Sequence, residues 1–235
     1  MSKVTNYFDE IRKHAEELKR LYKPKGLIIA VAGLAASGKT TGAKSLAEAL
    51  GLRYYSTGAI FREKAQEMGI SIEDFSKIRS DELDFEADKE TVKRMMEGNV
   101  VVDGRLVGVL ASVLKELEES EEIAIIRILY NPPIEIRAER YAQREGKPYD
   151  VSFEMIKERD KADMEKYSRM YGIKDLTDEK YYDIILDNSK WSAEDAKIEP
   201  LKHIISYLKR RNRLHLLNVE PLLEYLKKIG CFDFE

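Results

Sequence analysis

The sequence has few of the residues that build disulfides and metal sites. Of its 235 residues, one is a cysteine, Cys231, and three are histidines that lie far apart. A single cysteine excludes a disulfide within the chain and fits a reducing compartment, so we expect a cytoplasmic protein. The scattered histidines give no ligand spacing for a metal site.

Long apolar runs and an excess of charge of one sign are also missing. No run approaches the ~20 apolar residues of a membrane span, and the N-terminus lacks the apolar core of a signal peptide, so we expect no membrane partner. Charged residues make up 35% of the chain but nearly cancel, leaving a net charge of −3. This balance argues against broad binding to nucleic acid. The length suits one α/β domain with extensions.

The chain is organised around a glycine-bounded loop at residues 33–40, which fits the phosphate-binding pattern G-x-x-x-x-G-K-[ST] at every fixed position. An apolar run precedes the loop and a helical stretch follows it, as phosphate binding requires. Lys39 would reach the β- and γ-phosphate oxygens of ATP, and the Thr40 hydroxyl would bind Mg²⁺. A strand–helix turn with a surface lysine is the alternative, but it does not require the full pattern. The residues assigned to ATP here are Gly33, Leu34, Ala35, Ala36, Ser37, Gly38, Lys39, Thr40 and Thr41.

One position of this loop carries an unusual residue. If Ala36 must adopt a positive φ angle, its side chain costs about 1 kcal/mol or more there.

Five short apolar segments alternate with helical patterns along the chain. This alternation predicts an α/β fold with a five-stranded parallel sheet and helices on both faces. The strands are expected at 27–31, 52–55, 99–102, 123–130 and 181–186. Helices are expected at 5–22, 41–50, 59–68, from 71 onward, and at 81–97, 106–119, 134–144, 151–171, 192–212 and 219–229.

The first helix, 5–22, is amphipathic, with Phe8, Ile11, Leu18 and Leu21 near one face. We interpret it as an extension packed on the core; a helix on a membrane surface is the alternative.

An acid follows the almost purely valine strand at 99–102. Asp103 stands where a Walker-B carboxylate stands, close to the phosphate-binding loop and its Mg²⁺. A turn acid before Gly104 is the structural alternative. Whether Asp103 would bind the metal, directly or through water, or contact the acceptor remains open.

Several segments together resemble the nucleoside monophosphate kinases, and specifically the archaeal type of cytidylate kinase. They run in family order from about residue 26 to residue 207. The segments are 33–41, 55–62, 103–108, 137–140 with 144–146, 159–163 and 187–192. The resemblance implies a P-loop nucleoside monophosphate kinase domain at 26–207, with an acceptor-binding segment at 58–98 and a lid region at 140–171. Residues 1–25 and 208–235 would then be helical extensions.

The activity implied is transfer of the γ-phosphate of ATP to CMP or dCMP with Mg²⁺, by a monomer or a homodimer. Two alternatives stay open. One is a P-loop kinase for another small acceptor, such as AMP, UMP or a non-nucleotide. The other is a binding module gated by nucleotide that has lost transfer activity.

Phosphoryl transfer needs several cations around the phosphates, and arginine grips two oxygens at once. The resemblance implies that Arg62 and Arg105 hold the acceptor with Ser56 nearby, whereas a capping serine and a solvated arginine are the alternatives for Ser56 and Arg62. It also implies that Arg140 and Arg144 close over ATP. The catalytic set expected is Lys39, Arg105, Arg140 and Arg159.

A helical stripe follows at Arg159, Asp163 and Lys166. The resemblance implies Arg159 on phosphate and Asp163 near the cytosine, with Lys166 where bacterial relatives have arginine. A carboxylate could accept from the N4 amino group of cytosine. Ion pairing within the helix, worth ~0.3–0.5 kcal/mol, is the alternative. Asn188 resembles part of the adenine-binding segment, and Trp191 is expected to pack.

Overall fold

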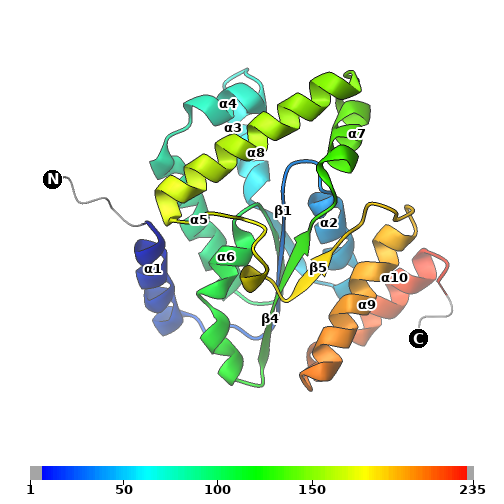
Figure 1. Cartoon of the computed structure of the whole chain (residues 1–235). Helices are drawn as coiled ribbons and strands as arrows, with labels where there is room; N and C mark the ends of the chain where they lie inside the picture. The colour runs from blue at the N-terminus through cyan, green and yellow to red at the C-terminus, as the bar shows by residue number, and fades with distance from the viewer. Residues whose placement is uncertain (1–6, 232–235) are drawn as a thin grey trace.

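A parallel five-stranded sheet forms the centre of the protein (Figure 1). The computed structural model describes residues 7–231, apart from the side chains of Glu73 and Lys77. The strand order is β2-β3-β1-β4-β5, and every neighbouring pair is parallel. The strands are β1 (Gly26–Gly33), β2 (Arg53–Ser56), β3 (Val100–Asp103), β4 (Ile123–Tyr130) and β5 (Ile184–Leu186). The predicted fold class is confirmed.

Helices cover both faces of this sheet. Strands β1, β3 and β4 are buried on both sides and are apolar apart from Asp103 at the end of β3 and Arg127 in β4. The helices are α1 (Tyr7–Leu21), α2 (Lys39–Leu50), α3 (Thr57–Glu67), α4 (Ile72–Ile78), α5 (Asp81–Met96), α6 (Val107–Ser112), α7 (Ile134–Glu145), α8 (Tyr149–Tyr171), α9 (Asp195–Arg210) and α10 (Val219–Lys228). One core cluster contains side chains of α1, α5, α6 and α8, and the other contains side chains of α2, α9 and α10.

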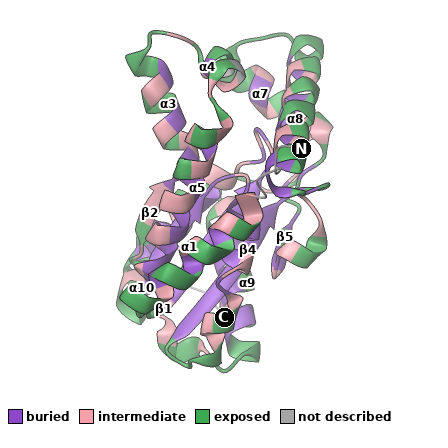
Figure 2. Cartoon of the chain, turned by 90° about the vertical axis from the view of Figure 1, so that its left-hand side faces the viewer, coloured by how far each residue is buried: buried purple, intermediate pink, exposed green. Residues whose placement is uncertain are grey.

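Four helices rise beyond the carboxyl ends of the strands, where α3 and α4 form one arm and α7 and the start of α8 form the other (Figures 1 and 2). Each arm has only a small apolar cluster, and many of its residues are exposed. Elements with few buried apolar contacts open at low free-energy cost. The two arms are therefore the parts of this fold best suited to move.

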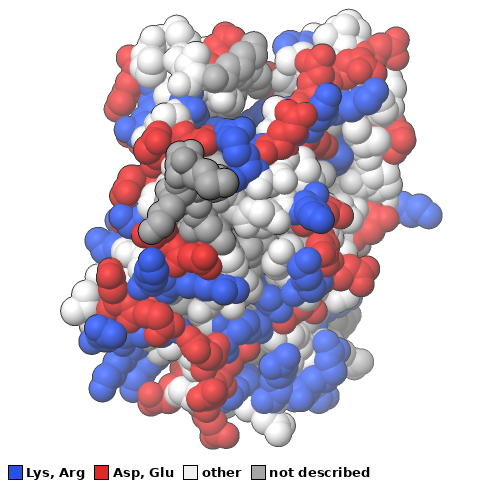
Figure 3. Space-filling model, turned by 60° about the vertical axis from the view of Figure 1, so that its left-hand side comes forward, with Lys and Arg blue, Asp and Glu red and all other residues white. Residues whose placement is uncertain are grey.

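The surface mixes both charge signs. Figure 3 shows acidic and basic side chains interspersed over one face. Between residues 7 and 231, no helix is both long enough and apolar enough to cross a bilayer.

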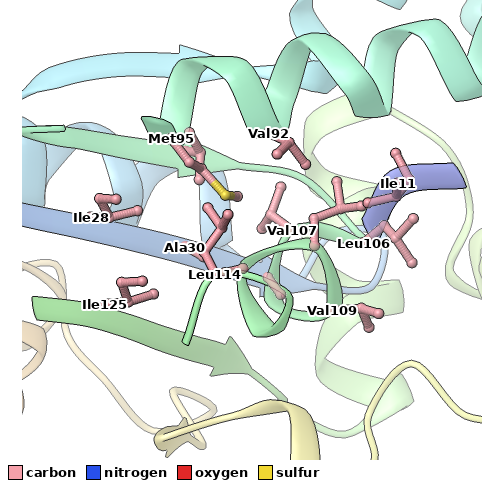
Figure 4. Close-up of a cluster of buried hydrophobic side chains, with 14 of the residues drawn as sticks. Ile11, Ile28, Ala30, Val92, Met95, Leu106, Val107, Val109, Leu114 and Ile125 are labelled. Atoms are coloured by element: carbon pink, nitrogen blue, oxygen red, sulfur yellow. The ribbon is translucent and has the colours of Figure 1, made fainter. Parts of the chain in front are cut away.

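The N-terminal helix is part of the core, as expected, although residues 5 and 6 of the predicted helix lie outside the described residues. Ile11 is fully buried and lies near Leu106 and Val107 of the segment after β3 (Figure 4). The predicted apolar face was wrong at its end, because Leu21 is 78% exposed. Ile11, Ala15 and Leu18 complete the buried stripe, and Leu21 lies about 80° away from that stripe on a helix of 3.6 residues per turn.

Two predicted elements were too long. The expected helix at 106–119 is α6 followed by a separate 3₁₀-helix, Lys115–Glu119. Lys115 Nζ donates to the Ile125 carbonyl and Glu118 accepts from the Ile125 N–H, so these side chains hold the 3₁₀-helix against β4. The expected strand at 181–186 is shortened to β5 by a further 3₁₀-helix, Glu179–Tyr181.

The remaining helix predictions differed only at their ends. Helix α3 begins two residues earlier than predicted, α2 begins at Lys39, and α9 is shorter than the predicted 192–212. A third 3₁₀-helix, Leu214–Leu216, lies between α9 and α10.

Candidate active site

The phosphate-binding loop joins the carboxyl end of β1 to α2, at the edge of the sheet where ligands bind in folds of this class. Its backbone enters the left-handed region at Ala36, with φ 59°, and at Gly38, with φ 89°. The strained alanine considered above is therefore present. The loop keeps a conformation that exposes backbone N–H groups at the start of α2.

Lys39 begins α2 and reaches back over the loop, where its Nζ donates to the Leu34 carbonyl at 3.2 Å. Burial lowers its pKa to about 8. Asp103 raises the pKa, while Arg105 and Arg159 lower it further. The lysine is thus held in a site that favours the arrival of an anion.

Asp103 is the centre of a hydroxyl cluster at the ends of β2 and β3. Its Oδ2 accepts hydrogen bonds from Thr40 Oγ1 at 2.7 Å, Tyr54 Oη at 3.1 Å and Ser56 Oγ at 3.2 Å. The parallel register places Ser56 directly beside Asp103. Ser56 precedes α3 but makes no side-chain cap bond, so the capping alternative is wrong for this residue.

The second carboxylate oxygen of Asp103 is available to bind a metal ion. Asp103 Oδ1 is buried and has no hydrogen-bond partner within the part of the chain that the structure describes. A carboxylate oxygen and the Thr40 hydroxyl, close together beside a phosphate-binding loop, match the oxygen ligands of Mg²⁺, which keeps waters and nucleotide phosphates as its other ligands. These two residues therefore fit a magnesium ion.

A cleft opens from this cluster towards the α3–α4 arm. Lys39, Arg62, Arg105 and Arg159 all contribute to its lining, as do Thr40, Ser56 and Asp103. Arg62 folds back so that its Nη1 lies 3.2 Å from where a side chain on Gly58 would begin. The structure thus brings together the predicted acceptor residues Ser56, Arg62, Asp103, Arg105 and Arg159. Burial lowers the pKa of Arg105, as does the charge of Arg159.

Asp163 lies at the edge of this cleft, 8% exposed, and forms an ion pair with Arg105. Lys166 pairs with Asp84 of α5 instead of with a residue of its own helix. The alternative that Asp163 only pairs within its helix is therefore wrong. Its partner comes from the loop after β3.

Arg140 of α7 contacts the outer side of the phosphate-binding loop. Its Nη1 donates to the Ser37 carbonyl at 3.2 Å, and its Nη2 donates to the Asn188 carbonyl at 2.7 Å. Asn188 Nδ2 also donates to the Ser37 carbonyl, at 3.1 Å. Arg140 and Asn188 are therefore placed beside the loop, on the side away from the acceptor cleft.

Three other residues of this region lie away from the acceptor cleft. Arg144 is exposed, donates to Glu145 and stacks over the Tyr141 ring. Trp191 packs edge-on against Tyr130 with ring centroids 6.2 Å apart, as expected of a packing residue. Thr41 lies in the first turn of α2 and is exposed.

Sequence reasoning missed three residues of the site. Tyr54 bonds to Asp103, and Arg79 lines the acceptor cleft. Arg137, 6% exposed, donates to the Ala35 carbonyl at 3.3 Å and thereby ties α7 to the phosphate-binding loop. Only Tyr54 had a usable signal, because its position in the strand before Ser56 put it at the same sheet edge.

The fold and the site define a P-loop kinase. Residues 28–190 match the cytidylate kinase-like family, and the chain belongs to that family. Its relatives include a cytidylate kinase of Methanopyrus kandleri, 38% identical over 183 residues that cover 74% of this chain and 94% of that protein. A cytidylate kinase of Pyrococcus horikoshii is 41% identical over 170 residues, 72% of this chain and 83% of the relative.

A solved structure supports the fold alone. It is an uncharacterized protein from Eubacterium ventriosum, with a TM-score of 0.53 and 22% identity, covering 77% of this chain and 99% of that chain.

Proposed function

We propose that the protein is a cytidylate kinase, which transfers the γ-phosphate of ATP to CMP or dCMP and forms ADP with CDP or dCDP. One observation carries the proposal beyond family membership. Lys39 and four arginines line a cleft that opens directly from the phosphate-binding loop and Asp103. Catalysis of phosphoryl transfer is mainly positioning and charge neutralisation, and this cleft supplies both.

ATP would bind with its phosphates in the loop 33–40 and against Lys39. Arg140 would contact these phosphates from the outer side of the loop, and Arg144 would join it if the α7–α8 arm closes. Thr40 and Asp103 would hold Mg²⁺, and the metal supplies neutralisation of phosphate charge when bound. Asn188 lies beside Ser37, which is consistent with the adenine end of ATP lying near it.

The acceptor phosphate would be held by Arg62, Arg105 and Arg159, with Ser56 nearby. No protein nucleophile is needed, because an acceptor phosphate oxygen attacks the γ-phosphorus while the bond to the ADP oxygen breaks. The arginines align the acceptor for this in-line attack and offset its charge. Lys39 and Arg105 stand between the two nucleotides.

Asp163 is the proposed reader of the acceptor base. Cytosine presents an amino donor at C4 and uracil presents a carbonyl acceptor there, so a carboxylate favours cytosine. The ion pair with Arg105 holds Asp163 beside the acceptor cleft. The same position allows a second interpretation, in which Asp163 only orients Arg105.

We further propose that the enzyme works in the cytoplasm as a monomer or a homodimer, with its catalytic domain at 26–207. The described parts of the two extensions, 7–25 and 208–231, contribute no residue to the acceptor cleft.

An acceptor panel tests this function. ADP release from ATP and Mg²⁺ would be followed with CMP, dCMP, UMP, AMP and no acceptor. We expect CMP or dCMP to give the highest kcat/KM. A preference for AMP or for a non-nucleotide acceptor would favour a kinase of other specificity, and no transfer with any acceptor would favour the binding module.

A further inference from the structure

A buried carboxylate behind the acceptor cleft connects α5, the turn between α4 and α5, and α8. Asp84 of α5 is 2% exposed. Its Oδ2 accepts a hydrogen bond from Arg79 Nε at 3.0 Å, and it forms an ion pair with Lys166 of α8. Asp84 therefore links the turn between α4 and α5 to the helix that carries Arg159 and Asp163.

The position of Arg79 is tightly defined. Its side chain is only 7% exposed, and its guanidinium lies 4.1 Å above the centre of the Phe61 ring. Asp84 occupies the Nε edge of the guanidinium. Among the residues whose side chains the structure describes, neither terminal amino group of Arg79 has a hydrogen-bond partner. A guanidinium fixed in this way keeps two amino groups with which it can bind a ligand.

Arg79 lies where two lobes of the cleft meet. The first lobe is the cationic one beside Lys39, and the second extends along α8 to Tyr141 and Met155 with a mainly apolar lining. Arg79, Ser76 and Arg159 line both lobes.

Arg79 lines both lobes, whereas Arg62 and Arg105 line only the cationic lobe beside Lys39. The strongest charge effects on Lys39 come from Asp103, Arg105, Arg159 and Arg62. The charge of Arg79 acts instead on Arg105 and on Tyr167. If the acceptor phosphate lies among the first three arginines, Arg79 faces what is attached to that phosphate.

We propose that Arg79 binds the nucleoside half of the acceptor nucleotide and that Asp84 is the positioning residue that aims it. This inference rests on the proposed function, because it takes the acceptor to be a nucleoside monophosphate. Because Asp84 pairs with both Arg79 and Lys166, it fixes Arg79 relative to α8. The side chain of Arg79 is then already in place, so less conformational entropy is lost when the acceptor binds.

The test compares CMP with cytidine, which lacks the phosphate. Arg79→Gln and Asp84→Asn should each raise the KM for CMP roughly 10- to 100-fold, the effect of losing charge-assisted hydrogen bonds. The inhibition constant of cytidine should rise by a similar factor, whereas the KM for ATP should stay within about twofold. Arg79→Lys keeps the charge but loses the planar fork, and should restore little of the affinity.

A double variant separates positioning from a general structural role. Because Asp84 acts through Arg79, adding Asp84→Asn to Arg79→Gln should not raise the KM for CMP further. The matched control is Asp81→Asn, since Asp81 pairs with the exposed Arg169 and joins the same two helices. This control should leave the KM for CMP unchanged.

Three outcomes would overturn the inference while transfer to CMP by the parent protein still supports the proposed function. They are an unchanged KM for CMP in Arg79→Gln, an unchanged inhibition constant of cytidine, and independent effects that multiply in the double variant. Absence of transfer to CMP in the parent protein would instead contradict the proposed function itself.

Discussion

Replacing Lys39 by methionine should abolish transfer and at the same time stabilise the folded protein. Methionine keeps the length and most of the volume of the lysine stem but removes the ammonium. Burial and the neighbouring arginines disfavour the charged form of the ammonium, and they lower its pKa to about 8. The charge on Lys39 therefore destabilises the folded protein without nucleotide. We proposed above that this charge binds the phosphates of ATP.

The magnitude follows from the pKa. A change from 10.5 to about 8 corresponds to about 3 kcal/mol of destabilisation while both states are protonated, as at pH 7. Lys39 is partly exposed, and its replacement also removes the bond to the Leu34 carbonyl and a neighbour of Asp103. We therefore expect a net gain of about 1–2 kcal/mol, or roughly 2–8 °C in Tm.

The pH dependence has a definite sign. Between pH 8 and 10.5 the unfolded chain holds more protons on this lysine than the folded protein does, so the contribution of Lys39 to the free energy of unfolding rises with pH in that window. Stabilisation by Lys39→Met should accordingly be largest below pH 8 and shrink above it.

Calorimetry of the two proteins at pH 7 and pH 10, together with ADP release at pH 7, would check this. We expect transfer to fall roughly 100-fold or more, since the proposed donor to the transferred phosphate is lost. A lower Tm than that of the parent at pH 7, or activity within tenfold of the parent, would refute the reasoning. A variant that is both more stable and inactive would show that the buried charge of Lys39 lowers stability and is needed for transfer.

Four further predictions concern the loop, the acceptor and the arms. Ala36→Gly should relieve the positive φ of 59° and raise the free energy of unfolding by about 0.5–1 kcal/mol in a denaturant titration. Arg62→Ala should raise the KM for CMP about 10- to 100-fold and leave ATP affinity unchanged; lost ATP affinity instead would reverse the assignment. A bisubstrate analogue should increase hydrogen-exchange protection in segments 58–97 and 140–171, and unchanged protection would argue against closure. Asp163→Asn should shrink the preference for CMP over UMP in kcat/KM, whereas equal losses with both acceptors would leave Asp163 only the role of orienting Arg105.

The central parts of the fold were predictable because their signals are local. The glycine-bounded loop, the apolar run before it and Asp103 after the valine strand each lie within a few residues in sequence. The carboxyl ends of parallel strands meet at one sheet edge, so these segments had to converge. The hydroxyl cluster on Asp103 follows from the same rule.

The contacts that join distant helices could not be predicted. Asp84 and Lys166 are 82 residues apart, and nothing in either segment indicates that α5 and α8 pack together. Arg105 and Asp163 are also far apart in sequence. From the sequence alone, the stripe of charges on α8 therefore suggested pairs within that helix. Arg79 was missed although its partner Asp84 is only five residues away, because nothing in its own stretch of sequence indicates that it lines the acceptor cleft.

The error at Leu21 has another cause. Leu21 was grouped with the apolar face although it lies about 80° from the stripe that Ile11, Ala15 and Leu18 form, so it stays exposed.

The measurement closest to the central claim is direct detection of the product. ATP, Mg²⁺ and CMP would be incubated with the protein, and nucleotides would be separated by ion-exchange chromatography, with Lys39→Met as the matched inactive control. The account predicts CDP and ADP in equal amounts with the parent protein and neither above background with the control. ADP without CDP, or equal CDP from both proteins, would contradict it.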